Sequence, residues 1–545
     1  MGLSRIGGIM YKFERLGVMI DMSRNAVMSV DALKKFLALL AKMGYNTALL
    51  YTEDTYEIDG EPFFGYMRGR YTKDELKALD DYAYSLGIEL IPCIQTLAHL
   101  NATIRWGQFP TDIEDILLVG DERCYQLIDR MFATCSECFR SRRIHVGMDE
   151  AHQLGRGRYL NQNGYQTVDV IMKRHLEAVT ELADKYNYEV MMWSDMFFNR
   201  WTNGRYYVEK TDIPKEYIAA KPECVTPVYW DYYHTEQKCF DDMIYNHKQF
   251  SNDTWFAGGV WTWSGFAPNN DYSLRTMIPA LNACRQGKIK NIFFTMWGDN
   301  GGECSRFSVL PALFYLAEYA KGHTDDEKIK AKFKRFTGID FDEFMSLDLP
   351  NHVTVPENSS PRNPAKYMLY SDCFNGFLDG TVKRGCSEEY AEAADTLFAV
   401  AKKSRRYGYL FDNMAKLCSA LEIKAELGVK TREAYRSGDK DALRALANND
   451  YTEAIKRIRL FAASNEKQWM LENKPEGLDV QDIRLGGCLR RLESCRRRLL
   501  DYLDGKVDEI HELSFELLPF GEREQGIIFN DVLKNMSCGV MYWGV

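Results

Sequence analysis

The chain has 545 residues, of which 46% are hydrophobic and 27% charged, a balance that excludes disordered, collagen-like and coiled-coil proteins. Its 69 Lys and Arg stand against 78 Asp and Glu, and the net charge of −9 disfavours nucleic acid or an anionic membrane as a partner. At about 150 residues per domain the length predicts three or four domains, or fewer if one of them is a barrel.

Targeting features and cysteine patterns are sparse. Residues 1–12 (MGLSRIGGIMYK) lack the apolar core and small-residue cleavage site of a secretory signal. No apolar run is long enough to predict a transmembrane helix. The 14 cysteines are scattered, and the C-x-x-C pair Cys135 and Cys138 lies in an amphipathic stretch that favours a packed helix over a zinc or redox site. We therefore expect a cytoplasmic protein with reduced thiols.

Short β-rich runs alternate with amphipathic stretches in the first 320 residues. Between the first two runs, Leu33, Phe36, Leu37, Leu40 and Met43 share one face of a predicted helix. Eight strand–helix units in about 300 residues predict an α/β fold, a (β/α)8 TIM barrel over residues 1–325. A doubly wound open sheet is the alternative, but no glycine-rich turn follows the first run. The predicted strands are residues 16–21, 47–51, 89–94, 144–149, 190–195, 225–231, 256–263 and 292–297.

The second half of the chain has a different character. Residues 326–386 contain a proline-rich stretch and are interpreted as a linker and the start of a helical region. Residues 387–545 lack strand signals and predict an α-helical C-terminal domain. Dimerisation of two copies through this domain is left open. Residues 469–487 are loop-like and polar, and ordinary packing is favoured over a reach into a site. An arginine cluster over residues 490–498 alternates with apolar residues and indicates a solvated helix face.

The segment RRIHVGMDEAH offers the most distinctive chemistry. An apolar strand runs directly into two adjacent carboxylates, Asp149 and Glu150. Neighbouring side chains within a strand point to opposite faces, so both acids can serve one site only where the strand ends. In a parallel barrel that carboxyl end is where active sites lie. A helix N-cap is the alternative explanation, and geometry alone leaves the two about equal.

Tryptophans recur at the ends of four later predicted strands. Two of them, Trp193 and Trp297, are followed two residues later by Asp195 and Asp299, on the same strand face. Flat apolar walls with carboxylates at their edge suit a pyranose, which has C–H faces and equatorial hydroxyls. The sequence therefore favours a sugar pocket over ordinary core packing. The tryptophans at the four strand ends are Trp193, Trp230, Trp261 or Trp263, and Trp297.

His145, Gly147, Asp149 and Glu150 match the His-any-Gly-any-Asp-Glu signature of the family 20 glycoside hydrolases, the β-N-acetylhexosaminidases. The resemblance covers roughly residues 13–305. The chain looks most similar to the intracellular bacterial exo-N-acetylglucosaminidases that join the barrel to a C-terminal helical domain. The resemblance implies a hydrolase that acts on an oligosaccharide or glycoconjugate without a cofactor.

The resemblance also implies roles for residues around the carboxylate pair. Arg15 matches the arginine that binds the 3- and 4-hydroxyls of the terminal sugar. His99 resembles the histidine that lies behind the catalytic pair, and Glu53 and Asp54 resemble the acidic pair after the second strand. His145 belongs to the signature and is expected to support the pair from behind.

Further residues resemble the family's sugar contacts. Tyr229 and Asp231 fit its Tyr-any-Asp motif, whose tyrosine holds the acetamide oxygen, but they fall on the sixth predicted strand rather than the seventh. The seventh strand instead offers Trp261 and Trp263, and Asp299 lies where the family places a carboxylate for the 4- or 6-hydroxyl. The residues that resemble tryptophans of the acetamide pocket and sugar face are Trp193, Trp230 and Trp297.

Adjacent carboxylates such as Asp149 and Glu150 do not easily flank a glycosidic bond, which agrees with the substrate-assisted exception among retaining glycosidases. We expect Glu150 to protonate the leaving oxygen and then to activate water. Asp149 would orient the 2-acetamido group, whose oxygen attacks the anomeric carbon to form an oxazolinium ion. Because two neighbouring carboxylates disfavour each other's ionisation, one of the pair is expected to stay protonated near neutral pH.

Three alternatives stay open. A metal hydrolase would use His145, Asp149, Glu150 and His152, but His145 and Asp149 would lie about 13 Å apart along a strand, so no metal is expected. A two-carboxylate glycosidase would act on sugars without an acetamide group. A non-catalytic glycan-binding protein would not need both acids. The sequence does not distinguish N-acetylglucosamine from N-acetylgalactosamine.

Overall fold

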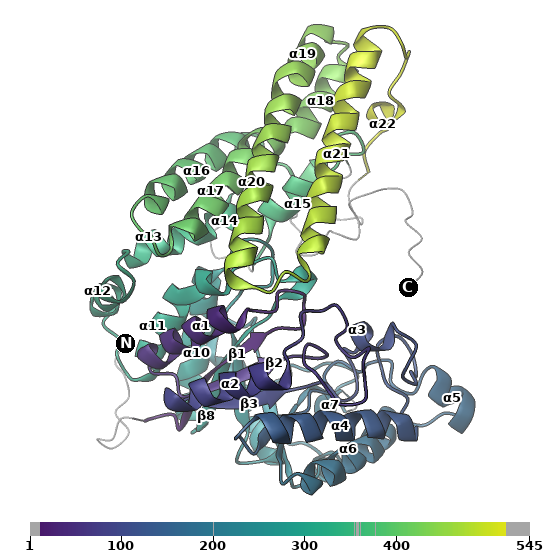
Figure 1. Cartoon of the computed structure of the whole chain (residues 1–545), viewed down its shortest axis with the longest axis vertical. Helices are drawn as coiled ribbons and strands as arrows, with labels where there is room; N and C mark the ends of the chain where they lie inside the picture. Colours follow the sequence, from purple (N-terminus) through teal and green to yellow (C-terminus); the bar gives the residue numbers. More distant parts are fainter. Residues whose placement is uncertain are drawn as a thin grey trace. The chain divides into compact units, whose positions relative to one another are not determined.

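The computed structural model describes residues 11–199, 201–353, 355, 359, 361–376 and 378–518. Its packing divides the chain into two units. The first comprises residues 1–260, 273–298 and 312–329, and the second comprises residues 261–272, 299–311 and 330–545. Figure 1 shows the chain coloured along the sequence, with the strands in its purple to teal part and a group of long helices in its green to yellow part.

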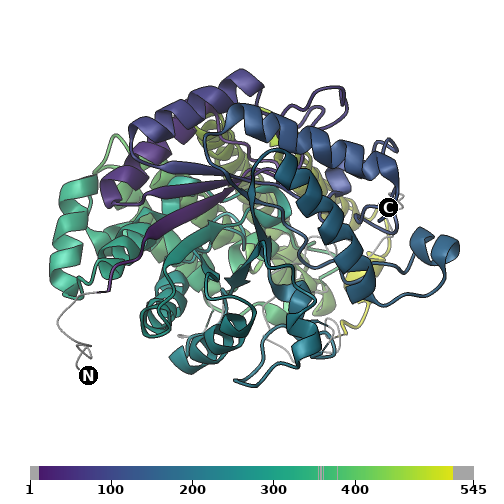
Figure 2. The same ribbon diagram turned by 90° about the horizontal axis from the view of Figure 1, so that it is seen from below.

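Eight parallel strands form a closed barrel in sequence order, β1 to β8, which confirms the predicted fold. β8 pairs with β1, with Leu16 beside Ile292, and so closes the ring. Figure 2 shows helices arranged outside these strands. The strands are β1 Arg15–Asp21, β2 Thr47–Tyr51, β3 Glu89–Cys93, β4 Arg143–His145, β5 Glu189–Trp193, β6 Val225–Trp230, β7 Trp255–Gly259 and β8 Asn291–Met296.

The helices that connect these strands form where capping signals and apolar faces coincide. The α1 N-cap Ser29 accepts a hydrogen bond from the Ala32 backbone, and the helix ends at Gly44 with φ of 94°. Thr72 and Glu75 form a capping box at the start of α2. The helices from β1 to the end of the barrel are α1 Val30–Met43, α2 Lys73–Ser85, α3 Asn101–Ile104, α4 Glu122–Cys138, α5 Arg158–Asn163, α6 Val168–Lys185, α7 Asp195–Phe198, α8 Lys215–Ile218, α9 Gln237–Phe250, α10 Asn270–Gln286 and α11 Leu310–Ala320.

The barrel interior is a packed apolar core. Alternate residues of each strand point inward, and Met19, Leu49, Ile91, Met191 and Phe293 belong to one buried cluster. Trp230 and Trp297 are partly buried and pack against this cluster. The predicted helical face of α1 is buried as expected, and Cys135 and Cys138 lie on the buried face of α4 as free thiols.

The second unit is helical and includes two segments that follow barrel strands. Within it, residues 299–305 contact the long helices, because Ser305 Oγ lies 2.6 Å from Glu472 and Arg484 lies 2.8 Å from Glu303. Its helices are α12 Asp326–Thr337, which starts in the first unit, α13 Phe341–Met345, α14 Leu349–His352, α15 Pro364–Tyr370, α16 Cys386–Ala401, α17 Gly408–Lys424, α18 Leu427–Arg436, α19 Lys440–Ala445, α20 Tyr451–Glu472, α21 Leu478–Leu503 and α22 His511–Ser514.

The expected domain boundaries differ from this packing. Residues 326–386, predicted as a linker and the start of the helical region, contain α12 to α15. Pro350 and Pro364 occupy the first turns of two short helices, where proline is tolerated. Residues 469–487, predicted as a loop, are largely helical, since α20 ends at Glu472 and α21 begins at Leu478. None of the described helices combines the length and apolar character that a membrane span requires.

Candidate active site at the carboxyl end of the barrel

The carboxylates Asp149 and Glu150 lie in a tight turn directly after β4. Gly147, Met148 and Glu150 have φ of 73°, 68° and 54°, a region that most L-residues avoid. A Cβ on Gly147 would lie 2.0 Å from Oε1 of Gln95, so any larger residue there would displace the side chain that binds Asp149. β4 therefore ends at its third residue, earlier than predicted, and the turn frees both acids from the alternation of a strand.

Asp149 is buried and held by two side chains. Its Oδ1 accepts a hydrogen bond of 2.7 Å from Gln95 Nε2, and its Oδ2 lies 3.2 Å from Nε2 of His99. Burial opposes ionisation of Asp149, but the charge and hydrogen bond of His99 and the Gln95 amide outweigh burial and lower its pKa. Asp149 is therefore ionised at neutral pH and held in one orientation.

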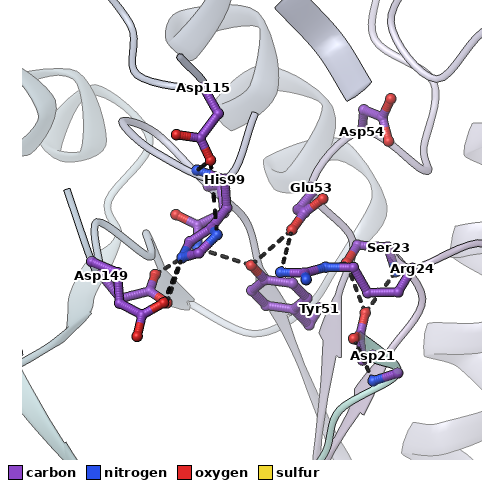
Figure 3. A network of polar contacts seen from close by, with 12 residues as sticks. Asp21, Ser23, Arg24, Tyr51, Glu53, Asp54, His99, Asp115 and Asp149 are labelled. Atoms are coloured by element: carbon purple, nitrogen blue, oxygen red, sulfur yellow. Dashed lines mark hydrogen bonds and ion pairs between the residues drawn. The ribbon is translucent and has the colours of Figure 1, made fainter. Parts of the chain in front are cut away.

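His99 connects the two acids with the loop after β3. Its backbone N–H donates to Asp115 (Figure 3). Its Nε2 lies 3.6 Å from Oε2 of Glu150. Burial lowers the pKa of His99, but the carboxylate of Asp149 more than compensates and raises it to about 10. His99 is thus a cation at neutral pH and lies beside both acids.

Glu150 differs from Asp149 in its surroundings. Its side chain is 50% exposed, whereas that of Asp149 is 13% exposed. Its backbone N–H donates to Asp195 Oδ2 at 2.9 Å. The two adjacent acids therefore have separate environments, one fixed and ionised and the other open to a ligand.

A second cluster of polar side chains contacts the cluster around Asp149 through Tyr51. The Tyr51 hydroxyl accepts a hydrogen bond of 2.9 Å from Gln95 and donates one of 3.1 Å to Glu53. Glu53 is buried and lies 3.3 Å from Nη2 of Arg24 (Figure 3). Asp54 points away from this pair and binds Arg68 at 3.2 Å. Of the two predicted acids after β2, only Glu53 joins the polar group that contains Tyr51.

Arg15 does not lie near the carboxylates at the end of β4. It is the first residue of β1, and its Nε pairs with Glu89 at the start of β3, 3.1 Å away. The amino ends of parallel strands lie at the face of a barrel opposite the carboxyl ends, so Arg15 belongs to the wrong end. Arg24, which follows β1, takes the position at the carboxyl end and was missed. The rule that barrel sites lie at carboxyl ends could have identified it.

Three tryptophans lie at the carboxyl ends of β5, β6 and β8. Trp193 is buried in the barrel core, where its ring lies 4.3 Å from that of His145 and 6.0 Å from that of Trp297. Trp297 also packs edge-on against Tyr51 at 4.7 Å. Trp230 Nε1 lies 3.5 Å from Asp195 Oδ1. Trp193 belongs to the buried cluster of the barrel, and Trp230 and Trp297 are partly buried and pack against that cluster, so their predicted contacts with a sugar stay predictions.

Tyr229 and Asp231 do not point into the barrel. The Tyr229 ring stacks on His247 of α9 at 4.6 Å, and its hydroxyl donates to Asp231 at 2.8 Å. Asp231 in turn accepts hydrogen bonds from the turn that contains His234. Because Val228 and Trp230 face inward, the strand alternation turns Tyr229 outward. Their predicted sugar-binding role therefore lacks geometric support.

Tyr232 is the tyrosine on the inner side. Its ring stacks on that of Trp230, with centroids 5.4 Å apart. Burial raises its pKa well above the usual value, so the hydroxyl keeps its proton, and the Asp149 charge acts in the same direction. The sequence signal for Tyr232 was weak, since it requires knowing where β6 ends.

Three predicted residues belong to the second unit. Trp261 and Trp263 stack on each other with centroids 4.1 Å apart, and Trp261 packs edge-on against Tyr272. Asp299 begins a short helical turn in the same unit. Their predicted contacts with a sugar stay predictions.

Asp195 is a buried carboxylate that lies between Glu150 and Trp230, both of which donate to it. Burial and the nearby charges of Asp149 and Glu150 raise its pKa to about 7. The sequence had marked it only as the acid two residues after Trp193. It is therefore the third carboxylate of the group and the one that changes charge near neutral pH.

We predict that Asp195 makes stability pH-dependent. Because its pKa is higher in the folded chain, the folded state binds more protons than the unfolded state between pH about 4 and about 7. As the pH rises through this range, the free energy of unfolding of the wild type should therefore fall relative to that of Asp195→Asn. Chemical denaturation of both proteins at several pH values measures the difference. Parallel curves would contradict the assignment.

His99, Asp149 and Glu150 are also the described residues whose ligand atoms lie close enough together to hold a metal ion. The protonated state of His99 opposes this, because a protonated imidazole is not a ligand. His145 and His152, the other candidates, lie elsewhere. His145 is buried beneath the turn and accepts from the Gly147 N–H, and His152 contacts Asn199.

Two family models match the chain. The model "Glycosyl hydrolase family 20, catalytic domain" matches residues 13–213, and "Glycoside Hydrolase 20C C-terminal domain" matches residues 342–529. Similar curated proteins include Hexosaminidase D of Homo sapiens, 25% identical over 361 residues, which are 58% of this chain and 68% of the human protein. Hexosaminidase D of Bos taurus is 25% identical over 359 residues, 59% of this chain and 97% of that protein.

Solved structures show more distant similarity. A family 20 exo-β-N-acetylglucosaminidase from Vibrio harveyi, in complex with N-acetylglucosamine, has 16% identity and a TM-score of 0.46 over 59% of this chain and 57% of its own. A family 20 β-N-acetylhexosaminidase from Streptomyces coelicolor A3(2) has 18% identity and a TM-score of 0.44 over 60% and 70%. The chain thus spans little more than half the length of the Vibrio protein.

Proposed function

Because the chain belongs to glycoside hydrolase family 20, we propose that it is an exo-acting β-N-acetylhexosaminidase that releases terminal non-reducing N-acetylglucosamine from an oligosaccharide or glycoconjugate. N-acetylgalactosamine is a second substrate of the same pocket in this proposal. The observation that carries it is the pair of adjacent carboxylates in unlike environments, with Asp149 buried and ionised and Glu150 half exposed.

The proposed mechanism is retaining and substrate-assisted. Two carboxylates from one turn do not easily flank a glycosidic bond, so in this proposal the acetamide oxygen of the sugar acts as nucleophile, as in the family 20 exception. Glu150 donates its proton to the leaving oxygen. It then accepts a proton from the water that opens the oxazolinium ion. The proton taken from water in the second step restores the acid form of Glu150, so the two steps balance without another proton donor.

Asp149 supports the acetamide in this mechanism. Its ionised carboxylate accepts a hydrogen bond from the acetamide N–H and stabilises the positive charge that develops on the oxazolinium ring. Gln95 and His99 fix its orientation in advance, which lowers the cost of reorganisation during the reaction.

Other groups are proposed as sugar contacts. Arg24 and Glu53, paired at 3.3 Å, replace Arg15 as the charged groups for the ring hydroxyls. Trp230 and Trp297 offer the apolar faces, and Trp261, Trp263 and Asp299 stay candidates on the resemblance alone. Cytoplasmic location and a homodimer through the helical domain also stay predictions.

Hydrolysis of 4-nitrophenyl N-acetyl-β-D-glucosaminide at neutral pH tests the proposal. We expect turnover that a thiazoline analogue of the oxazoline blocks, and proton NMR should show the β-anomer of the released sugar first. Turnover should persist in EDTA, since the mechanism uses no metal. Comparable turnover of the corresponding glucoside, or release of the α-anomer first, would contradict substrate-assisted retention.

Tyr232→Phe tests which tyrosine binds the acetamide oxygen. Removal of the hydroxyl should lower kcat/KM on the aryl glycoside at least about tenfold, because a donor to the developing charge is lost. Tyr229→Phe is the matched control. It removes the donor to the buried Asp231, so it should lower Tm with a smaller loss of kcat/KM. A larger kinetic loss in Tyr229→Phe would contradict the assignment of Tyr232.

A further inference from the structure

Three aromatic side chains form a partly exposed group that the catalytic proposal does not use. We call Phe63, Tyr66 and Trp106 the rim cluster. Trp106 has its ring centroid 5.7 Å from that of Phe63 and 5.5 Å from that of Tyr66, and Phe63 and Tyr66 are 5.9 Å apart. Phe63 is 40% and Tyr66 39% exposed. Large aromatic side chains normally bury such surface, so a contiguous exposed group indicates a binding surface.

The rim cluster lies on the loops that also carry catalytic-site residues. Phe63 and Tyr66 belong to the loop after β2, which contains Glu53, and Trp106 belongs to the loop after β3, which contains His99. Both loops leave the carboxyl ends of their strands, where the Asp149–Glu150 turn also lies.

Ring contacts join the two loops, because Trp106 packs against Phe63 and Tyr66. The Arg105 guanidinium lies over the Trp106 ring, 4.7 Å from its centroid. The positive charge of Arg105 also opposes the rise in the pKa of Asp54 that burial causes.

The loop after β2 is held in place by hydrogen bonds and by buried side chains. Gly65 has φ of 64°, and a Cβ there would lie 2.1 Å from the Asp54 carbonyl oxygen, so the turn between Phe63 and Tyr66 requires glycine. Arg68 binds Asp54 and Asn25, and the buried Phe64 packs edge-on against Tyr56 at 5.2 Å. A surface held in place before binding loses little conformational entropy when a ligand arrives.

We propose that the rim cluster is a subsite for the leaving-group side of the substrate, and that it binds the second or third sugar of a β-linked N-acetylglucosaminyl oligosaccharide. This inference rests on the proposed function, because the cluster shares its loops with the groups around the scissile bond. Pyranose rings present flat C–H faces to aromatic rings, and Arg105 offers hydrogen-bond donors to hydroxyl and carbonyl oxygens.

A sugar fits this surface better than a protein partner does. A stable protein interface buries about 800 Å² on each side, far more than three partly exposed rings present. Sugar rings, by contrast, match single aromatic side chains in size. The substrate class is therefore an oligosaccharide that extends beyond the cleaved sugar.

Binding to a catalytically impaired protein tests the subsite separately from turnover. In the Glu150→Gln background, calorimetry with N,N′,N″-triacetylchitotriose and with N-acetylglucosamine gives the gain in affinity from the additional sugars. Adding Trp106→Ala should weaken trisaccharide binding about tenfold, with a much smaller effect on the monosaccharide. Tyr66→Ala, a change at a more exposed ring, should act in the same direction.

Tyr84→Ala is the matched control. Tyr84 is 68% exposed and lies beside Arg140 with a cation–π distance of 4.9 Å, but it is on α2 and away from these loops. It should leave both affinities within about twofold. Equal effects of Trp106→Ala and Tyr84→Ala on the trisaccharide, with Tm retained, would overturn the subsite.

The outcomes separate the two proposals. If the wild type cleaves the aryl glycoside but Trp106→Ala leaves trisaccharide binding unchanged, the subsite is wrong and the proposed function stands. If Trp106→Ala weakens binding but no glycoside is cleaved, the surface binds glycans and the catalytic proposal is wrong. A change in light-scattering mass without a change in sugar affinity would make the cluster a protein contact and overturn the subsite.

Discussion

Glu150→Gln should lower kcat on a substrate with a poor leaving group, such as a chitobiose unit, by about 10²–10⁴-fold. The loss arises because glutamine cannot donate a proton to the leaving oxygen. A 2,4-dinitrophenyl glycoside needs little protonation, so its first step should lose much less. Steady-state and burst kinetics on the two substrates measure this difference.

Glu189→Gln is the control for this variant. Glu189 begins β5 at the opposite end of the barrel, and its side chain is 67% exposed. The same chemical change there should leave kcat on both substrates near the wild-type value. Equal losses on good and poor leaving groups in Glu150→Gln would remove Glu150 from the role of general acid.

Asp149→Asn should lower kcat by about 10²–10³-fold, the cost of removing one preorganised charge from a developing cation. It should also weaken binding of the thiazoline analogue, because the acetamide loses the acceptor that orients it. The variant retains the shape of Asp149 and can keep its Gln95 contact, but it loses the ion pair with His99, so its Tm should fall. Activity is therefore compared at a temperature where both proteins are folded.

The same variant has a spectroscopic signature. Asp149 is the main cause that raises the pKa of His99 to about 10, against the opposing effect of burial. Without that charge the pKa of His99 should fall below its usual range, and His99 should be neutral at pH 7. NMR titration of His99 in the two proteins measures this shift. An unchanged titration would show that the His99–Asp149 ion pair is absent in solution.

Local patterns were sufficient to predict the barrel and the carboxylate pair. The eight strands were found from runs of β-branched and apolar residues, and α1 from its apolar face, because these periodicities follow from local backbone geometry. The meeting of Asp149 and Glu150 at one end followed from their adjacency after a strand. The boundaries were less accurate, since β4 ends at His145 where left-handed residues begin.

The choice between neighbouring candidates required the tertiary structure. Arg15 and Arg24 flank the same strand, and only the direction of β1 within the barrel puts Arg24 beside Glu53. Tyr229 and Tyr232 lie three residues apart, and the end of β6 decides that Tyr229 faces α9 while Tyr232 stacks on Trp230.

By itself, the sequence determined that this protein is a parallel barrel with adjacent acids at its carboxyl end, followed by a helical region. The tertiary structure decided which partners those acids have. Gln95 and His99 come from the loop after β3 and Asp195 from the end of β5, far from Asp149 along the chain. There, burial opposes ionisation of Asp149, but the charge and hydrogen bond of His99 outweigh burial and lower the pKa of Asp149. Burial and the charge of Asp149 raise the pKa of Asp195 to about 7. Periodicity is a local property, whereas burial and charge–charge distances exist only once distant segments have packed together.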